Sequence, residues 1–218
     1  LRVPDDKRLY KVDAGGVLRV AAGSGQADRA NQSGKPAAQA ALGYLDEAIP
    51  LPDGGLVLVD HIDRLARVSR VAPDGTLTEA WRKESEAGYP LPAIGAAALL
   101  PGGDVALFVD LNFKTEVWVL AAAGGEPKLA TTLEGLSTSW MSDAGVTADG
   151  KHVLLTGNPL GGRGAGTYAL DLPGFGGGAA PIVPEDMERW TLFDLAGRAF
   201  QVTSSKWSMA TLAGDGTA

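Results

Sequence analysis

The chain has 218 residues, of which 45% are hydrophobic and 21% are charged, which is typical of a globular protein. It contains no cysteine, so disulfides, thiolate zinc sites and cysteine nucleophiles are excluded. The net charge of −7 argues against nucleic acid and anionic lipid as partners. No apolar stretch approaches the roughly 20 residues of a membrane-spanning helix.

The N-terminal part of the chain predicts a strand pair followed by a short helix. The content of 30 glycines and 13 prolines is typical of many short strands joined by tight turns. Residues 8–12 and 17–21 are expected to be two such strands, which form a partial unit at 1–22. The alanine-rich segment 35–45 is the best helical candidate and is expected to span one or two turns.

The first complete unit covers residues 44–81 and contains four predicted strands. They are expected at 48–51, 56–59, 66–71 and 76–81. The sequence Pro-Asp-Gly-Gly at 52–55 forms the first turn, because glycine adopts positive φ and aspartate bonds its own backbone. Residues 60–65 are expected to be a loop between the second and third strands.

Three further units follow the same order of strands and turns. They are predicted at 94–132, 140–184 and 188–213, the last with weaker signals. Their loops between the second and third strands are placed at 110–115 and 157–166, and the glycine-rich run 173–181 is expected to be a flexible turn. A four-stranded unit that recurs about every 45–50 residues indicates a repeat architecture. The prediction is an all-β protein, a β-propeller of four-stranded antiparallel blades in a single domain over 1–218, with four to five blades visible.

Two motifs resemble the NHL-repeat family in its bacterial form. PDGGLVLVD at 52–60 and RVSRVAPDG at 67–75 fit its blade pattern, while AGSG at 22–25 and GKPAAQAAL at 34–42 resemble its inter-blade insertion. The final AGDGTA at 213–218 resembles the opening of a second insertion. Propellers of this family usually have six blades, so the resemblance implies that the chain is a fragment. The alternative is ring closure, with residues 8–21 completing a blade that begins near Trp190.

The resemblance implies a non-catalytic interaction scaffold, expected to be extracytoplasmic, that binds a protein, peptide or carbohydrate. The loops between second and third strands should meet on one face of a propeller, where ligands usually bind. The polar and aromatic residues predicted at this face are Asp60, His61, Asp63, Arg64, Asp110, Asn112, Lys114, Asn158, Arg163 and Trp190. The alternative interpretation is that they are ordinary charged loop tips and packed aromatic rings.

An enzymatic function is the second hypothesis. His61 follows Asp60 and is the candidate general base, although no G-x-S-x-G nucleophile motif accompanies it. Alignment of the inner strands by their turn glycines places Glu47 and Asp143 at equivalent positions, where two carboxylates could hold Ca²⁺. Otherwise these groups are solvated or accept backbone N–H bonds. Calcium is thus the one cofactor considered, for a hydrolase or lyase similar to gluconolactonase-type propellers.

Overall fold

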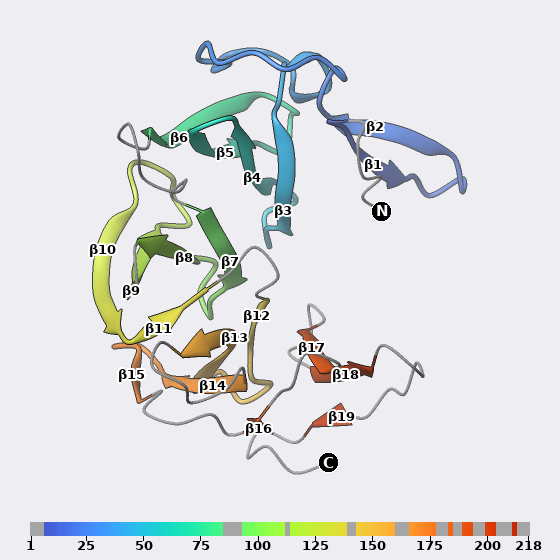
Figure 1. Ribbon diagram of the computed structural model, residues 1–218. Coiled ribbons are helices and arrows are strands. Elements are labelled where there is room, and N and C mark those ends of the chain that lie inside the picture. The colour runs from blue at the N-terminus through green and yellow to red at the C-terminus, as the bar shows by residue number, and fades with distance from the viewer. Residues whose placement is uncertain are drawn as a thin grey trace. The chain divides into compact units, whose positions relative to one another are not determined.

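A computed structural model of the chain (Figure 1) consists of β-strands and one short 3₁₀ helix in the part that it describes. The described residues are 7–84, 93–111, 114–138, 143–159, 166–177, 183–184, 189–193, 199–203 and 211–212. The chain folds as two compact units, residues 1–92 with 124–126, and residues 93–123 with 127–218.

The first unit contains a two-stranded hairpin and a four-stranded antiparallel sheet. The hairpin is formed by β1 (Leu9–Val12) and β2 (Leu18–Ala22). The sheet has the order β3-β4-β5-β6, and its strands are β3 (Tyr44–Pro50), β4 (Leu56–Ile62), β5 (Leu65–Val71) and β6 (Leu77–Glu84). This sheet is the four-stranded unit predicted at 44–81.

The helical prediction over 35–45 is wrong except for a single turn. Only η1 (Ala37–Gln39) is helical, and it has 3₁₀ geometry. Ala40 is already extended, at φ −69° and ψ 137°. The carbonyls of Ala37 and Ala40 accept hydrogen bonds from Gly23 and Ser24, each at 2.8 Å. These backbone bonds to a distant segment replace the next turn of a helix.

The core of the first unit joins the hairpin, the η1 segment and the four-stranded sheet. Leu9 and Ala22 of the hairpin lie in one buried cluster with Leu42, Leu58 and other apolar side chains. Neither sheet covers its own apolar face alone, so the two share a core, as expected for stacked repeats.

The predicted loop at 60–65 is also wrong. β4 continues to Ile62 and β5 begins at Leu65, so the connection shrinks to Asp63 and Arg64, with Asp63 at a φ of +50°. The ladder between β4 and β5 extends beyond the predicted strand end through the pairs of Asp60 with Arg67, His61 with Ala66 and Ile62 with Leu65. The same lengthening occurs at the predicted loop 110–115, since β8 runs to Leu111 and β9 begins at Lys114.

The second unit repeats the four-stranded meander and continues into two irregular sheets. The meander has the order β10-β9-β8-β7, and its strands are β7 (Ala93–Leu99), β8 (Val105–Leu111), β9 (Lys114–Leu120) and β10 (Lys128–Glu134). The next sheet is built on β13 (His152–Pro159) and β14 (Gly166–Asp171), flanked by β11 (Leu136–Ser137), β12 (Ala144–Val146), β15 (Gly176–Gly177) and β16 (Val183–Pro184).

The outer positions of this third sheet are each split between two short strands. β11 and β12 both pair with β13, while β15 and β16 both pair with β14. The run 173–181, predicted as a flexible turn, therefore contains a short paired strand. The meander and this sheet share a buried cluster that includes Phe108, Val117 and Tyr168.

The last described sheet has the order β17-β18-β19. It consists of β17 (Arg189–Phe193), β18 (Ala199–Thr203) and β19 (Thr211–Leu212). β1 and β2 form a sheet of their own within the first unit, and the completion of a blade by residues 8–21 with the strands near Trp190 stays a prediction. Within the described ranges, no helix combines the length and apolar character needed to cross a membrane.

Candidate functional site

A buried ion pair lies at one end of the sheet β3–β6. Arg67 and Asp60 are 1% and 0% exposed, and Nη2 of Arg67 lies 2.5 Å from Oδ2 of Asp60. The same oxygen accepts a hydrogen bond from the Gly43 amide at 2.6 Å and one from Arg67 Nε at 3.2 Å. Gly43 approaches closely because it has no side chain: a Cβ there would lie 2.0 Å from the His61 carbonyl oxygen.

Burial dominates the electrostatics of the Asp60 carboxyl. It raises the pKa of Asp60, and the Arg67 guanidinium and the Gly43 amide oppose that rise. The second oxygen, Oδ1, is buried and makes no hydrogen bond to any described residue. Removal of Arg67 alone would therefore leave a poorly solvated carboxyl in the protein interior.

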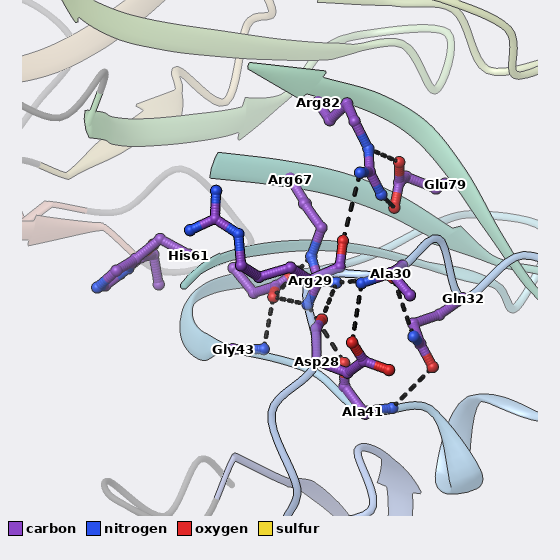
Figure 2. Close-up of polar contacts among 12 residues, drawn as sticks. Asp28, Arg29, Ala30, Gln32, Ala41, Gly43, His61, Arg67, Glu79 and Arg82 are labelled. Atoms are coloured by element: carbon purple, nitrogen blue, oxygen red, sulfur yellow. Dashed lines mark hydrogen bonds and ion pairs between the residues drawn. The ribbon is translucent and has the colours of Figure 1, made fainter. Parts of the chain in front are cut away.

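Arg67 also fastens the connecting segment, which we define as residues 23–43, to the sheet. Figure 2 shows its guanidinium among the main-chain carbonyls of this segment. Nη1 donates to the Asp28 carbonyl at 2.8 Å and Nη2 to the Ala41 carbonyl at 3.3 Å. Gln32, which is 1% exposed, bonds the Ala30 carbonyl and the Ala41 amide from within the segment. The buried Arg67 side chain thus binds the connecting segment both in its first part, at Asp28, and near its end, at Ala41.

Contacts with β6 anchor the rest of the connecting segment. The backbone of Leu77 exchanges hydrogen bonds with Gly34 and Lys35, each at 2.9 Å. Arg29 forms an ion pair with Glu84, and the Arg29 carbonyl accepts a hydrogen bond from Arg82 at 3.3 Å. The connecting segment is therefore tied to both ends of β6, at Leu77 where the strand begins and at Arg82 and Glu84 where it ends.

His61 faces a carboxylate that the sequence analysis did not identify. Its Nδ1 lies 2.8 Å from Oδ2 of Asp46, and the two side chains are 37% and 33% exposed. The pairing of β3 with β4 shifts between Leu45 and Glu47, so Asp46 is the extra residue of a β-bulge. Bulges redirect side chains, and this one places Asp46 beside a histidine on the neighbouring strand.

An aromatic ring completes this group. The Tyr44 ring lies 5.5 Å from the His61 ring, with 33° between their planes, and 52% of Tyr44 is exposed. Lys7 Nζ lies 5.2 Å from the centre of the Tyr44 ring, within the range of a cation–π contact. In Figure 2, His61 lies apart from the hydrogen-bond network around Arg67.

We call these exposed groups the blade-end surface and define it as Tyr44, Asp46, His61, Asp63 and Arg29. Asp63 and Arg29 are 75% and 44% exposed and lie 3.5 Å apart. The surface therefore carries two carboxylates, one guanidinium, one imidazole and one phenol on a sheet end that buried contacts hold in place.

The remaining predicted residues of this region behave differently from one another. Asp60 lies inside a strand with a buried carboxylate, which corrects its predicted position in an exposed loop. Arg64 lies in the two-residue turn between β4 and β5, within the predicted loop 60–65. Asp110 lies within β8, opposite Thr115 of β9, and Lys114 Nζ lies 3.6 Å from Oε1 of Glu116.

Four predicted residues have no described side chain. Asn112 and Arg163 lie outside the described residues. Asn158 is placed by its backbone opposite Ser137, and Trp190 by its backbone opposite Val202. Their proposed contributions to binding stay predictions.

The strand register places Glu47 and Asp143 at matching positions. Counted from the turn, the pair of Ala48 with Leu58 matches the pair of Ala144 with Leu155, and Glu47 and Asp143 each come one residue before it. The Oδ1 atom of Asp143 accepts a hydrogen bond from the Ala144 amide at 2.9 Å. No group of three His, Asp or Glu side chains suited to a metal ion occurs among the described residues. The calcium site stays a prediction.

Among solved structures, the chain is similar to TolB from Acinetobacter baumannii, with a TM-score of 0.61 and 15% identity over 96% of this chain. It is also similar to virginiamycin B lyase from Staphylococcus aureus, with a TM-score of 0.52 and 11% identity over 97% of this chain, and to an oligogalacturonate lyase solved with manganese, with a TM-score of 0.52 and 15% identity over 97%.

These likenesses confirm the predicted all-β propeller fold. The chain spans 47% of the TolB chain and 61% and 60% of the two lyase chains. No protein-family model and no curated protein matches the chain, so the resemblance to NHL repeats remains a prediction about family.

Proposed function

We propose that this propeller is a non-catalytic binding scaffold and that the blade-end surface contacts a protein or peptide ligand. The observation that carries the proposal is the joint display of Tyr44, Asp46 and His61 at partly exposed positions on a clamped sheet end. Aromatic residues are enriched in protein interfaces, and a rigid surface loses little conformational entropy when a ligand binds.

The charges of the surface favour a peptide that carries both signs. Asp63 and Arg29 are close enough to each other for their charges to compensate, and each remains accessible to a ligand. Tyr44 offers an apolar ring with a polar end, which suits contact with a peptide backbone or an aliphatic side chain. A carbohydrate that stacks on Tyr44 is the competing ligand class.

The test is selection of a displayed random peptide library on the full chain, followed by titration of the enriched peptides. We expect the variant that combines Tyr44→Ala with His61→Ala to lose most of the binding, while Lys128→Glu, an exposed change on β10, retains it. Equal binding by the double variant would place the ligand elsewhere and overturn the proposal. Selection of no peptide, with retention of soluble oligosaccharides instead, would replace the peptide by a carbohydrate.

The contact between His61 and Asp46 favours a hydrolase or lyase as the second candidate. A carboxylate only accepts hydrogen bonds, so it fixes the imidazole proton on Nδ1, and Nε2 is the atom that would act as the base. A panel of lactones and uronide oligosaccharides, with and without millimolar calcium, tests this function. Activity that His61→Ala leaves unchanged would exclude His61 as the base.

A further inference from the structure

A phenol ring, an imidazole and a carboxylate are adjacent on the blade-end surface. Tyr44 and His61 pair in register across β3 and β4, and directly opposite residues of an antiparallel pair place their side chains on the same face. The bulge brings Asp46 to the same group, with Oδ2 2.8 Å from His61 Nδ1. All three side chains are partly exposed, so a ligand can contact them together.

A cation already lies against this group. Lys7 Nζ is 5.2 Å from the centre of the Tyr44 ring, which is the geometry of a cation–π contact. Lys7 is itself partly exposed, so another ammonium or guanidinium group can exchange with it. The π face of the ring and the negative charge of Asp46 both attract cations. The net charge of −7 adds a long-range attraction for a basic ligand.

The negative charge of Asp46 is available to a ligand only while His61 is neutral. Histidine is the side chain that usually gains a proton between about pH 8 and pH 5. With a neutral imidazole, the pair of His61 and Asp46 carries one negative charge. With a protonated imidazole at 2.8 Å, the carboxylate is compensated within the protein. A ligand cation then loses the attraction of Asp46 and is repelled by the imidazolium.

Other charged and titratable groups surround His61 on the neighbouring elements. They are Tyr44 on β3, Lys83 across Ala66 on β6, Asp63 and Arg64 in the turn, Arg29 of the connecting segment, and Lys7 beyond the Tyr44 ring. The buried Asp60 lies on the opposite face of β4, where Arg67 holds it. Asp63 and Arg29 compensate each other at 3.5 Å, so Asp46 is the carboxylate that protonation of His61 masks.

We propose that the blade-end surface takes a basic side chain of its ligand, a lysine or an arginine, against the Tyr44 ring and the Asp46 carboxylate, and that protonation of His61 releases it. This inference rests on the proposed binding function and adds to it the charge of the ligand and the control by pH. Linkage makes the effect reciprocal, because a bound cation opposes proton uptake by His61 as strongly as the proton opposes the cation.

The experiment measures affinity at about pH 8 and about pH 5.5 for peptides selected near pH 8 from a displayed random library on the full chain. We expect the selected peptides to contain lysine or arginine. Peptides without histidine are titrated, so that the imidazoles that gain protons belong to the chain. Binding should be about fivefold weaker at the lower pH. Acetylation of the peptide lysines should weaken binding near pH 8 by a similar factor and remove most of the pH dependence.

The second of the two histidines in the chain provides a matched control. His152 Nε2 lies 3.3 Å from Oδ1 of Asp171, and the His152 side chain is 33% exposed. His61→Asn keeps an N–H donor for Asp46 but cannot become charged, so it should bind at both pH values as the unaltered chain does near pH 8. His152→Asn should keep the full pH dependence. Melting curves confirm that each variant is folded.

The outcomes distinguish this inference from the proposed function. Peptides that lose binding in the double variant Tyr44→Ala with His61→Ala, yet lack basic residues or bind equally at both pH values, would overturn the inference alone. A pH dependence that persists in His61→Asn, or disappears in His152→Asn, would also overturn it. Peptides that bind the double variant unchanged, or a selection that enriches no peptide, would overturn the inference and the proposed function together.

Discussion

Replacement of Arg67 by methionine should destabilise the protein far more than the same replacement of Arg70. Both arginines lie on β5, and each places Nη2 2.5 Å from the Oδ2 atom of an aspartate. They differ in burial: the side chains of Arg67 and Asp60 are 1% and 0% exposed, whereas those of Arg70 and Asp53 are 21% and 43% exposed. A comparison of the two variants therefore isolates the effect of burial, because the two ion pairs have the same distance and differ in exposure to solvent.

The expected magnitudes follow from the contacts that are lost. Arg67→Met removes two donors to Asp60 and the bonds to the Asp28 and Ala41 carbonyls. The loss of one partner of a buried pair costs about 3–5 kcal/mol, a large part of the roughly 5–15 kcal/mol that stabilises a typical protein. Arg70→Met breaks a pair that solvent screens and should cost less than about 1 kcal/mol.

Urea unfolding followed by circular dichroism measures both variants, and hydrogen exchange at the Gly43 amide reports the local effect. We expect the amide to lose protection in Arg67→Met because its acceptor, Asp60, is no longer held in place. A double variant, Asp60→Leu with Arg67→Met, should recover part of the lost stability, since it leaves no buried charge. Equal losses for the Arg67 and Arg70 variants, or no recovery in the double variant, would refute the reasoning.

Three further predictions concern other parts of the chain. The Thr76 amide donates a hydrogen bond to Asp74 and holds the pKa of that carboxyl below its usual value. The ionised carboxyl therefore stabilises the fold at a pH above the usual pKa, and this contribution is lost as the pH falls through the lower pKa of the folded state. Asp74→Asn should flatten the decline of the melting temperature below about pH 4, and an unchanged slope would contradict this. Gly43→Ala forces a Cβ against the backbone of His61 and should lower the free energy of unfolding in urea by about 1–3 kcal/mol. Gly174→Ala is the control, because a Cβ there meets nothing within 4 Å, and it should change the free energy of unfolding little. Similar losses for both variants would count against the close approach. If Glu47 and Asp143 take part in holding calcium, millimolar calcium should raise the melting temperature relative to chelator, and no shift would remove that site.

The regular part of the fold could be predicted from sequence because short-range signals determine it. Turns such as Pro-Asp-Gly-Gly and Pro-Asp-Gly mark where each hairpin reverses, and the apolar runs between them mark the strands. These signals located the complete sheets at 44–81 and 94–132. They also indicated the weak pair near residue 190, whose strands the structure describes as β17 and β18.

The site was predicted less well because its defining contacts are long-range. Asp60 and His61 have the polar character of a loop, so the sequence predicts a strand that ends at residue 59, whereas β4 continues to Ile62. A signal did exist: Asp60 and Arg67 are equidistant from the turn at Asp63 and Arg64, and opposite charges at such positions face each other across a tight hairpin. No comparable pattern predicts that a bulge will place Asp46 beside His61.

The sequence differences among the repeats explain why the blade-end surface and the buried ion pair beneath it belong to the first complete sheet. The register position of Asp60 and Arg67 is occupied by Val109 and Glu116 in the next sheet, and by Gly157 and Gly166 in the third. The first sheet also contacts the connecting segment, whose carbonyls at Asp28 and Ala41 accept bonds from Arg67.

A buried arginine has more donors than a single carboxylate can satisfy, and a loop that packs on a sheet has carbonyls that need donors. The two requirements meet at Arg67, which explains why a costly buried charge is present in this sheet and is replaced by other residues in its neighbours. If this is correct, grafting Asp and Arg onto Val109 and Glu116 should destabilise the second sheet, because the described residues beside that sheet include no segment like 23–43 that could accept the remaining donors. A graft that leaves the urea midpoint unchanged would show that the pair needs no such loop.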